Sequence, residues 1–401
     1  MQSTDRPAKL PATTGRSLRL VRRAMAHLSA TVLLAAGVGT TVSAAPQEFP
    51  TSKVPLAVKP IATGLKHPWA VEVLPDGATI VTEREGNLRI VRNGQSSAPI
   101  RGVPRVVAQD QGGLLDVALA PDFETSRILF LSHSAPGQDG AGTAITRARL
   151  SADEKSLEDV QRIFTMSKAT QSGENFGSRI AIAADGSLFF GTGDRGEPER
   201  AQDPRDHAGA ILHIAADGSI PASNPYAGHA GGLPEIWSKG HRNPQGIAID
   251  PKDGTLVTAE HGARGGDEIN LPQPGRNYGW PVISYGKDYS GAEIGEGTAR
   301  DGYEQPAYYW DPSIAPGAVA VYRGAMFPEW DGNLLVAALK YQTLVRLERD
   351  ETGAIVSEER MLDGAFGRLR DVKVAPDGAI LLLTDEDDGA LLRVSRLPSS
   401  Q

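Results

Sequence analysis

The sequence repeats one short pattern six times, and this repeat constrains the fold more than any other feature. In each copy a turn that contains Asp, with Gly in five of the copies, precedes an apolar run of strand length. The turns lie at 74–77, 120–123, 184–186, 250–254, 331–332 and 375–378, and the runs after them read ATIVTE, RILFLS, SLFFGTG, TLVTAE, NLLVAAL and AILLLTD. Five turns also follow a short apolar run: AVEVL, LDVALA, RIAIA, GIAID and DVKVA. A strand, an Asp-Gly turn and a second strand predict a β-hairpin.

Six similar hairpins at blade-like spacing predict an all-β fold, a six-bladed β-propeller of four-stranded blades. A β-sandwich with coincidental turns is the alternative, and the similarity of the six copies disfavours it. We expect the ring to close by pairing of a strand after Pro55 with the C-terminal segment LLRVSRL. Longer loops are expected at 135–175, 195–245 and 262–315, where polar and aromatic residues gather; loops on a rigid scaffold commonly carry function.

The N-terminus has the pattern of an export signal. Residues 16–23 are basic, residues 28–38 are apolar, and Val42-Ser43-Ala44 offers small residues for cleavage. The apolar run is short for a membrane span, so we predict cleavage, a periplasmic or secreted protein and no stable membrane insertion. Arg22-Arg23 leaves a twin-arginine route open. The predicted parts are an export signal peptide (1–44), an N-terminal extension (45–57) and a propeller dehydrogenase domain (58–397).

Charge and cysteine content exclude several functions. The net charge is −8 although the first 44 residues are basic, so the remainder is strongly acidic. Nucleic acid is therefore excluded as a partner, because phosphate binding needs a basic face. The chain has no cysteine, which excludes thiol catalysis, disulfides and zinc-thiolate sites.

Four polar clusters are candidates for chemistry. They are the segments QGGLLD (111–116), ENFGSR (174–179) with GDRG (193–196), GHRNPQG (240–246) with EHGARGGDE (260–268), and Lys340 with Arg368 and Arg370. Arginine forks bind carboxylates in a bidentate way, so these cations together with Arg242 predict a site for a small polyanion; isolated surface cations are the alternative. Glu268 and its neighbour Asp267 suit calcium, or else they cap turns.

Several longer segments resemble one family, the soluble quinoprotein aldose sugar dehydrogenases. They are GLLDVALAPDF, FGSRIAIAADGSLFFGTGDRG, PEIWSKGHRNPQG, EHGARGGDEIN, NYGWPVISYG, EQPAYYWDPSIAP, LLVAALK and GRLRDV. The resemblance runs from about Leu65 to Val394. It implies a six-bladed propeller that holds pyrroloquinoline quinone (PQQ) and calcium over its central channel.

The resemblance also assigns roles to residues. It implies that Lys340, Arg368 and Arg370 bind the quinone carboxylates, and that Arg242, Asn243 and Tyr289 contact the cofactor. The implied calcium ligands are the backbone carbonyls of Gly262 and Ala263, where the family usually has proline at the second position, with Glu268 and Tyr278 at a further site. The implied substrate contacts are Gln111 and Trp310.

One position departs from the family pattern. The family has histidine as general base in His-Phe-Gly-Ser-Arg, whereas this chain has Asn175-Phe176-Gly177-Ser178-Arg179. An amide cannot accept the hydroxyl proton, although imidazole is suited to it. Asp194, which matches the carboxylate that supports the base, is present, and Glu174 could act as base through a water.

The resemblance therefore implies oxidation of aldose sugars at C1 to lactones, with calcium as Lewis acid and electrons passed to an external acceptor. Asn175 is expected to reduce this activity. One alternative is a propeller that binds quinone or carbohydrate without turnover. Another, less favoured, is a calcium-dependent lactonase, in which Lys340, Arg368 and Arg370 would have no task.

Overall fold

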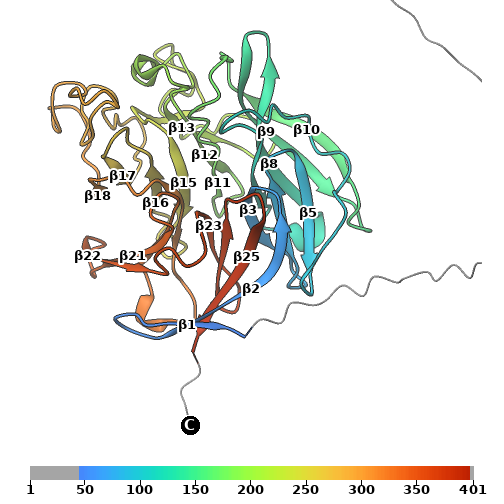
Figure 1. Cartoon of the computed structure of the whole chain (residues 1–401). Helices are drawn as coiled ribbons and strands as arrows, with labels where there is room; N and C mark the ends of the chain where they lie inside the picture. Colours follow the sequence, from blue (N-terminus) through green and yellow to red (C-terminus); the bar gives the residue numbers. More distant parts are fainter. Residues whose placement is uncertain (1–44, 398–401) are drawn as a thin grey trace, which may run out of the picture. The chain divides into compact units, whose positions relative to one another are not determined.

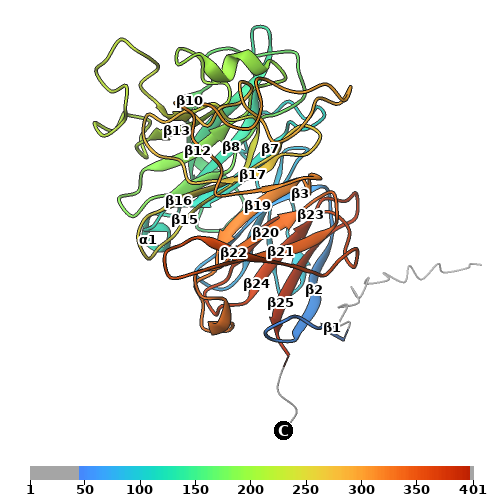
Figure 2. The same ribbon diagram turned by 90° about the vertical axis from the view of Figure 1, so that its left-hand side faces the viewer.

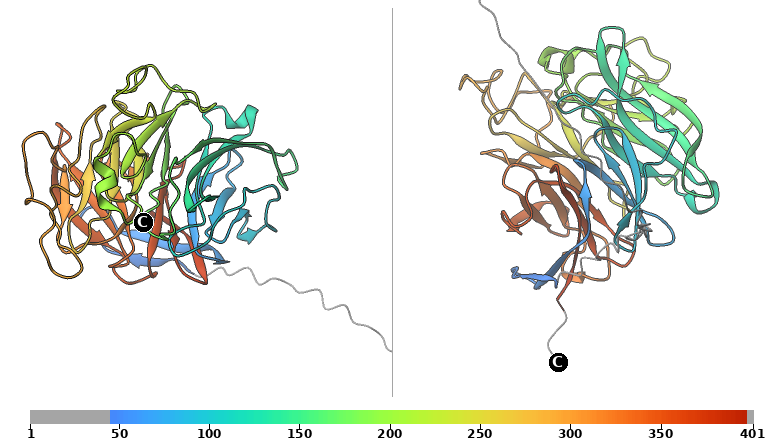
Figure 3. Two further views of the ribbon diagram at one scale, coloured as in Figure 1. Left: turned by 90° about the horizontal axis from the view of Figure 1, so that it is seen from above. Right: turned by 45° about the vertical axis from the view of Figure 1, so that its right-hand side comes forward.

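The computed structural model describes residues 45–397, which form six antiparallel sheets, or blades, of a β-propeller (Figure 1). The blades follow one another in chain order around the body, as the succession of colours in Figure 3 shows. The export signal predicted at 1–44 lies outside the described residues. In the described part of the chain no helix is long and apolar enough to cross a membrane.

Each of the first three blades holds four strands. Blade 1 consists of β3 (Pro68–Val73), β4 (Thr79–Glu83), β5 (Asn87–Arg92) and β6 (Gln95–Ser96). Blade 2 consists of β7 (Leu114–Leu119), β8 (Ile128–Gly137), β9 (Gly140–Leu150) and β10 (Leu157–Thr165), with helix α1 (Phe123–Ser126) between its first two strands. Blade 3 consists of β11 (Ile180–Ile182), β12 (Leu188–Thr192), β13 (Ala210–Ile214) and β14 (Ile236–Lys239), with the 3-10 helix η1 (Pro198–Gln202) after β12.

The other three blades follow the same order. Blade 4 consists of β15 (Pro244–Ile249), β16 (Leu256–Glu260), β17 (Asp267–Asn270) and β18 (Tyr308–Trp310). Blade 5 consists of β19 (Pro316–Val321), β20 (Leu334–Ala338), β21 (Thr343–Arg349) and β22 (Ile355–Met361), with the 3-10 helix η2 (Pro328–Trp330) before β20. Blade 6 contains β23 (Leu369–Val374), β24 (Ile380–Thr384) and β25 (Gly389–Arg396) from the end of the chain, and β2 (Leu56–Leu65) and β1 (Gln47–Phe49) from its beginning.

The shared strands of blade 6 close the ring. β2 pairs antiparallel with β25, with Leu56 opposite Arg396 and Leu65 opposite Gly389. Figures 1 and 2 show the blue strand β2 beside the red strand β25. The closure predicted after Pro55 is confirmed, and β1 extends this blade to five strands.

The predicted turns lie between the first and second strands of the six blades. In the turn of blade 1, Asp76 Oδ1 accepts the Ala78 backbone N–H at 3.0 Å, and Gly77 has a φ of 84°. Asp377 accepts the N–H of Ala379 in the same way in blade 6, at 3.1 Å. An Asp that bonds the backbone two residues on, next to a Gly in the left-handed region, is the chemistry that makes these turns readable from sequence. The predicted fold class is therefore confirmed.

The sequence pattern failed for strands that lie away from the axis or far from their turn. The loops predicted at 135–175, 195–245 and 262–315 are wrong in part, because they contain outer strands of blades 2, 3 and 4. The outermost strand β10, for example, exposes most of its residues and so lacks an apolar run. β19 was missed because residues 322–330 separate it from the turn at 331–332.

Hydrophobic packing between neighbouring blades forms the core. In β24, Ile380 and Leu382 face a cluster with Trp330 of blade 5, while Leu381 and Leu383 face the cluster on the side of blade 1. Successive side chains of a strand point to opposite faces, and each face of this blade is covered by a neighbour. This double burial explains why AILLLTD is an apolar run rather than an alternating one.

The first strands of the blades surround the propeller axis and run in the same direction along it. Gln245 and Arg370, each the second residue of its strand, line a cavity at one end, whereas residues 247–249 and 371–374 of the same strands line a channel of about 390 Å³ at the other. We call these two spaces the cationic cavity and the axial channel. The strands thus bring equivalent positions of different blades together at each end.

Candidate active site

The cationic cavity has a volume of about 160 Å³ and is built where the first strands begin. The charged and amide side chains that line it are Arg84, Gln111, Gln245, Arg368, Arg370 and Asp385. Three guanidinium groups thus face a single carboxylate. An acidic protein that concentrates cations in one cavity has a site suited to an anion.

Arg370 lies on the wall of this cavity and is almost fully buried. Its Nη1 donates to Gln245 Oε1 at 3.0 Å, and its Nη2 donates to Asp385 Oδ2 at 2.6 Å. Asp385 also lies 3.0 Å from His67 Nδ1. Burial lowers the pKa of the Arg370 guanidinium. Its Nε is buried without a hydrogen-bond partner among the described residues, so one donor remains for a ligand.

The remaining cations near the cavity have weak partners or none. Arg368 is exposed and approaches Asp385 only to 4.0 Å. Within residues 45–397, the side chains of Arg84 and Lys340 form no ion pair or hydrogen bond. Lys340 is exposed next to Leu339, which lines the cavity, and its ammonium lies 5.5 Å from the centre of the Tyr341 ring. The structure therefore brings Arg368 and Arg370 together and places Lys340 at the border of the cavity.

Asn175 and Asp194 form a buried pair. Asn175 Nδ2 donates to Asp194 Oδ1 at 2.8 Å, and its backbone N–H donates to Gln111 Oε1 at 3.0 Å. Asp194 Oδ2 accepts the indole N–H of Trp280 at 2.8 Å. Because Asp194 uses one of the two amide N–H groups, the Asn175 side chain keeps its oxygen as an acceptor and one further N–H as a donor. The neighbouring Glu174 is exposed.

Arg242 and Asn243 connect this pair to the rest of the site. The Arg242 guanidinium lies 5.4 Å from the centre of the Trp280 ring and donates to the Gly262 carbonyl at 2.5 Å. Asn243 Oδ1 accepts the Gly177 N–H at 3.1 Å and the Gln245 amide at 3.1 Å. Its Nδ2 is a second buried donor without a partner in the described part of the chain.

An acidic corner lies beside Arg242. Glu260 accepts from Asn270 Nδ2 at 2.8 Å, and Glu268 accepts from the same amide at 3.0 Å. Burial and the charge of Glu260 raise the pKa of Glu268 to about 8. Both carboxylates and Tyr278 border a cavity of about 10 Å³, roughly the room that one water or ion needs. A buried carboxylate next to a partly buried one forms a position that a cation would stabilise.

The backbone contributes the other implied metal ligands. Gly262 borders the same small cavity, and Ala263 follows it. The Tyr278 hydroxyl donates to the Leu271 carbonyl at 2.6 Å and accepts the Gln273 N–H at 3.0 Å, so Tyr278 could ligate only through its carbonyl. No group of three or more His, Asp or Glu side chains in residues 45–397 is arranged to hold a metal. A cation here would therefore depend on backbone oxygens.

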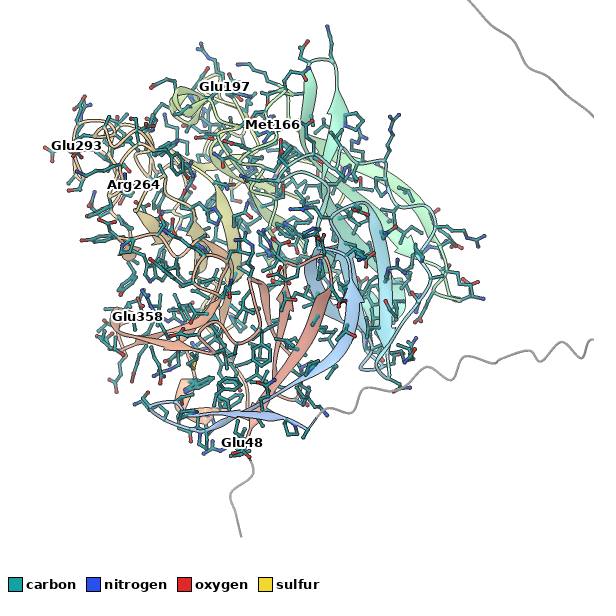
Figure 4. All side chains as sticks on the ribbon, viewed as in Figure 1. Glu48, Met166, Glu197, Arg264, Glu293 and Glu358 are labelled. Carbon is teal, nitrogen blue, oxygen red and sulfur yellow. The ribbon has the colours of Figure 1, made fainter. Side chains whose placement is uncertain are left out.

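Two expected residues do not reach the cavity. Trp310 is 3% exposed in the core of blades 4 and 5, and its indole N–H donates to Glu358 Oε2 on β22 at 2.7 Å. Figure 4 shows Glu358 at the outer edge of the body. Tyr289 is 71% exposed on the long loop between β17 and β18. Neither residue lines the cationic cavity or the small cavity beside Glu268.

Sequence reasoning missed several residues of the site. Arg84 and Trp69 line the cationic cavity, Asp385 holds Arg370, and Trp280 holds Asp194. A signal was present for Trp280, which stands in the segment NYGWP, and for Asp385, which ends the sixth strand run. His261 borders both cavities; burial lowers its pKa to about 4, and its Nε2 lies 3.0 Å from the Pro316 carbonyl.

The fold and the site define the class of this protein as a six-bladed β-propeller with a cationic cavity on its axis, and comparison with known proteins gives the family. The sequence matches the glucose/sorbosone dehydrogenase family over residues 65–393. It is 43% identical to an aldose sugar dehydrogenase of Escherichia coli over 337 residues, which are 82% of this chain and 90% of the relative. The chain therefore belongs to the glucose/sorbosone dehydrogenase family.

Solved structures support the same assignment. A crystal structure of a glucose dehydrogenase has a TM-score of 0.83 and 42% identity, and the match covers 88% of this chain and 100% of the other. The PQQ-bound aldose sugar dehydrogenase of Streptomyces coelicolor has a TM-score of 0.69 and 27% identity, with 86% and 100% covered. The predicted family, and with it an oxidoreductase that acts on sugars, is confirmed.

Proposed function

We propose that the protein oxidises aldose sugars at C1 to lactones, with PQQ and calcium bound, and passes the electrons to an external acceptor. The observation that carries this proposal is the cationic cavity, where Arg370 retains a buried donor without a partner in residues 45–397; Asn243, which contacts Gln245 of the cavity wall, retains a second. A buried donor without a partner costs free energy, so a site that retains two of them is suited to a ligand rich in acceptor oxygens.

The donor set fits a quinone that carries several carboxylates. Arg368 and Arg370, with Lys340 at the border, would hold the carboxylates, while Arg242 and Asn243 would lie against the ring. When bound, PQQ supplies the two-electron oxidation, and the protein binds and orients the reactants. The PQQ-bound relative from Streptomyces coelicolor supports this choice of cofactor.

The acidic corner fits calcium. Glu268 would supply a carboxylate, and Gly262, Ala263 and Tyr278 would supply backbone carbonyls, which are hard oxygen ligands of the kind calcium takes. The raised pKa of Glu268 supports a cation here, since a cation would remove the repulsion from Glu260. A cation near the Gly262 carbonyl would have to share it with Arg242 or displace that guanidinium.

Asn175 sets the rate in this proposal. Its oxygen can accept a hydrogen bond from a sugar hydroxyl and so orient it, but an amide does not take up the proton. Gln111, which bonds the Asn175 backbone, would contact the substrate. The proton would pass to solvent or, through a water, to the exposed Glu174. General-base catalysis contributes about 10²–10⁴-fold, so turnover should be slow rather than absent.

A second function is favoured by one observation. The hydrogen bond from Asn175 Nδ2 to Asp194 Oδ1 gives both side chains a buried partner, so the base position is stable as an amide. A propeller that binds quinone or carbohydrate without turnover would have this arrangement.

Reconstitution distinguishes these functions. Purified protein would be loaded with PQQ and calcium, passed through a desalting column, and tested with a panel of aldoses and an artificial electron acceptor. Reduction of bound quinone by an aldose supports the dehydrogenase. Retained quinone that no aldose reduces supports the binding role. Protein that retains no quinone contradicts the dehydrogenase and a quinone-binding role, and calorimetry with the same aldoses then tests carbohydrate binding.

We further propose that residues 1–44 direct export and are removed, so that the enzyme works in the periplasm or outside the cell. N-terminal sequencing of the protein from the cell envelope should begin after Ala44. An intact Met1 on that protein would contradict the proposal.

A further inference from the structure

Arg179 lies on the propeller axis and contacts all five other blades. It directly precedes β11 of blade 3, and its side chain is almost completely buried. Its guanidinium contacts Asp116 Oδ1 of blade 2 at 3.0 Å, the Gln245 carbonyl of blade 4 at 3.2 Å, the Gly317 carbonyl of blade 5 at 3.1 Å, Asp371 Oδ1 of blade 6 at 3.1 Å, and the Trp69 ring of blade 1 at 4.1 Å from its centre. One planar group with five donors makes this set of contacts possible.

The two carboxylates extend the network into the backbone. Asp116 Oδ2 accepts the Ile180 N–H at 2.6 Å, and Asp371 Oδ2 accepts the Val71 N–H at 2.9 Å. Each carboxylate therefore joins the first strands of two adjacent blades, and Arg179 holds the carboxylates together.

The network divides the axis into two spaces. Arg179, Asp116 and Asp371 line the axial channel, whereas Gln245 and Trp69, which Arg179 contacts, line the cationic cavity. Arg179 lies between the two spaces and supports the residues that form the inner end of the cavity.

Gln245 carries this support to the anion-binding groups. Its carbonyl accepts from Arg179, its Oε1 accepts from Arg370 Nη1 at 3.0 Å, and its Nε2 donates to Asn243 Oδ1 at 3.1 Å. Trp69 makes a second link, because both Arg179 and Arg370 lie against its ring, at 4.1 and 5.8 Å from the centre. Two independent contacts thus connect Arg179 to Arg370.

We infer that Arg179 is a positioning residue of the cofactor site, which fixes Gln245 and Trp69 and through them sets the place of Arg370 and Asn243. The inference rests on the proposed function, because the quinone is the ligand that Arg370 and Asn243 would bind. Arg179 does not line the cationic cavity and has no catalytic role.

The test replaces the guanidinium group of Arg179 by an ammonium group and so keeps the positive charge. Arg179→Lys still neutralises Asp116 and Asp371, but an ammonium cannot reach both carboxylates and both carbonyls in one plane. We expect the dissociation constant for PQQ, measured by quinone absorbance in the presence of calcium, to rise about 10- to 100-fold, the range for groups that orient a ligand-binding residue. KM for the sugar should stay unchanged.

Lys373→Arg is the matched control. Lys373 lines the same axial channel and pairs with Glu72, but it has no contact with Gln245 or Trp69. This exchange should leave PQQ affinity unchanged. An equal loss in both variants would show general loosening of the channel and would overturn the inference.

A second variant covers the case in which Arg179→Lys does not fold. The triple change Arg179→Met, Asp116→Asn and Asp371→Asn replaces the ionic network by neutral groups of similar size, which commonly preserves stability. It should bind PQQ as weakly as Arg179→Lys, with a urea midpoint near that of the wild type. Wild-type affinity in a folded variant of either kind overturns the inference.

Citrate, a small tricarboxylate, separates this inference from the proposed function. If the wild type binds no PQQ but binds citrate by calorimetry, the proposed function fails, and weaker citrate binding by Arg179→Lys still supports the positioning role. If the wild type binds neither, both proposals fail.

Discussion

Charged side chains line both the axial channel and the cationic cavity, but the two spaces differ in whether these charges are paired. In the axial channel every charge has a partner: Arg179 contacts Asp116 and Asp371, and Lys373 contacts Glu72. Asp116 and Asp371 also accept backbone N–H groups, so both oxygens of each carboxylate have a partner.

The cationic cavity is incomplete by the same measure. Arg84 and Lys340 have no side-chain partner in residues 45–397, Arg368 approaches Asp385 only to 4.0 Å, and Arg370 retains a buried donor without a partner. Both spaces include residues of β15 and β23: Gln245 and Arg370 border the cationic cavity, and residues 247–249 and 371–374 border the axial channel. The comparison teaches that cations alone do not identify a binding site; several cations that border one cavity and lack close partners do.

The largest expected effect concerns the site beside the cationic cavity, where a substitution restores the missing general base. Asn175→His places an imidazole beside Asp194, which can orient the ring, and so restores a proton acceptor. The turnover rate of the PQQ-loaded enzyme should rise by about 10²–10⁴-fold, while PQQ affinity stays the same. Steady-state kinetics with an artificial acceptor measure it, and the pH–rate profile should gain a limb from the imidazole.

Asn175→Gln is the control, because it changes the side chain without adding a base, and no rise is expected. Adding Asp194→Asn to Asn175→His should remove most of the gain. A wild type that is already fast and does not improve would identify another base, with Glu174 the first to test.

The next prediction removes the cation that is shared by the two carboxylates of the axial channel. Arg179→Gln leaves two buried carboxylates without their cation, and breaking a buried pair in this way costs about 3–5 kcal/mol of unfolding free energy. Lys340→Met removes an exposed cation at the border of the cationic cavity and should change the free energy of unfolding by less than about 0.5 kcal/mol. Urea unfolding of both variants gives the comparison.

Addition of Asp116→Asn to Arg179→Gln should recover part of the loss, since one uncompensated charge is removed. Equal losses of unfolding free energy in Arg179→Gln and Lys340→Met would contradict the difference in charge pairing between the axial channel and the cationic cavity.

A smaller effect is expected on the affinity of the cationic cavity for PQQ. Arg370→Ala removes charge-assisted hydrogen bonds to a carboxylate, which contribute about 1.5–3 kcal/mol each, or roughly 10- to 100-fold in affinity. Titration of the apo protein with PQQ in the presence of calcium measures the change. Arg92→Ala, which removes an ion pair with Asp76 outside both spaces, is the control and should bind normally. Unchanged affinity in Arg370→Ala would remove this residue from the site.

The smallest effect is a pH dependence of the free energy of unfolding, which arises from Asp116 in the axial channel. Burial raises the pKa of Asp116 to about 6, against the opposing charge of Arg179. Between about pH 4 and pH 6 the folded state then binds a proton that the unfolded state has released, so this group lowers stability as pH rises, by at most about 1.4 kcal/mol per pH unit.

Other carboxylates work in the opposite direction, so the comparison with Asp116→Asn isolates the effect. Ion pairs lower the pKa of Asp206 and Asp250 to about 2, and these groups lose their stabilising contribution only as pH falls below about 4. The stability of the wild type relative to Asp116→Asn, from urea unfolding at pH 4, 5, 6 and 7, should fall as pH rises. A difference that is constant over this range contradicts the prediction.

Local sequence signals predicted the blades because hairpins depend on neighbouring residues. An Asp that bonds the backbone two residues on and a Gly with positive φ form the same turn wherever they occur, so Asp76-Gly77 and Asp377-Gly378 were readable without knowledge of the fold. Outer strands such as β10 were not readable, because their exposed faces carry no apolar pattern.

The candidate site was predictable only in part. The cations Arg368 and Arg370 are two residues apart at the start of β23, and the structure places both on the cavity. Trp310 appeared in a motif of the same quality, yet packing against Glu358 turns it into the core. Side-chain direction in loops and edge strands depends on neighbours that the motif does not contain.

The sequence by itself determined six hairpins, and with them the propeller, since the turn chemistry and the apolar runs act over a few residues. It also determined that position 175 carries an amide. Only the tertiary structure decided which charges are paired. Arg179 meets Asp116 and Asp371 at about 3 Å, although these residues lie in segments far apart along the chain. Electrostatic pairing requires contact distances, and the packing of the blades around the axis sets those distances. No local pattern could therefore show that the axial channel is neutralised while the cationic cavity is left open for a ligand.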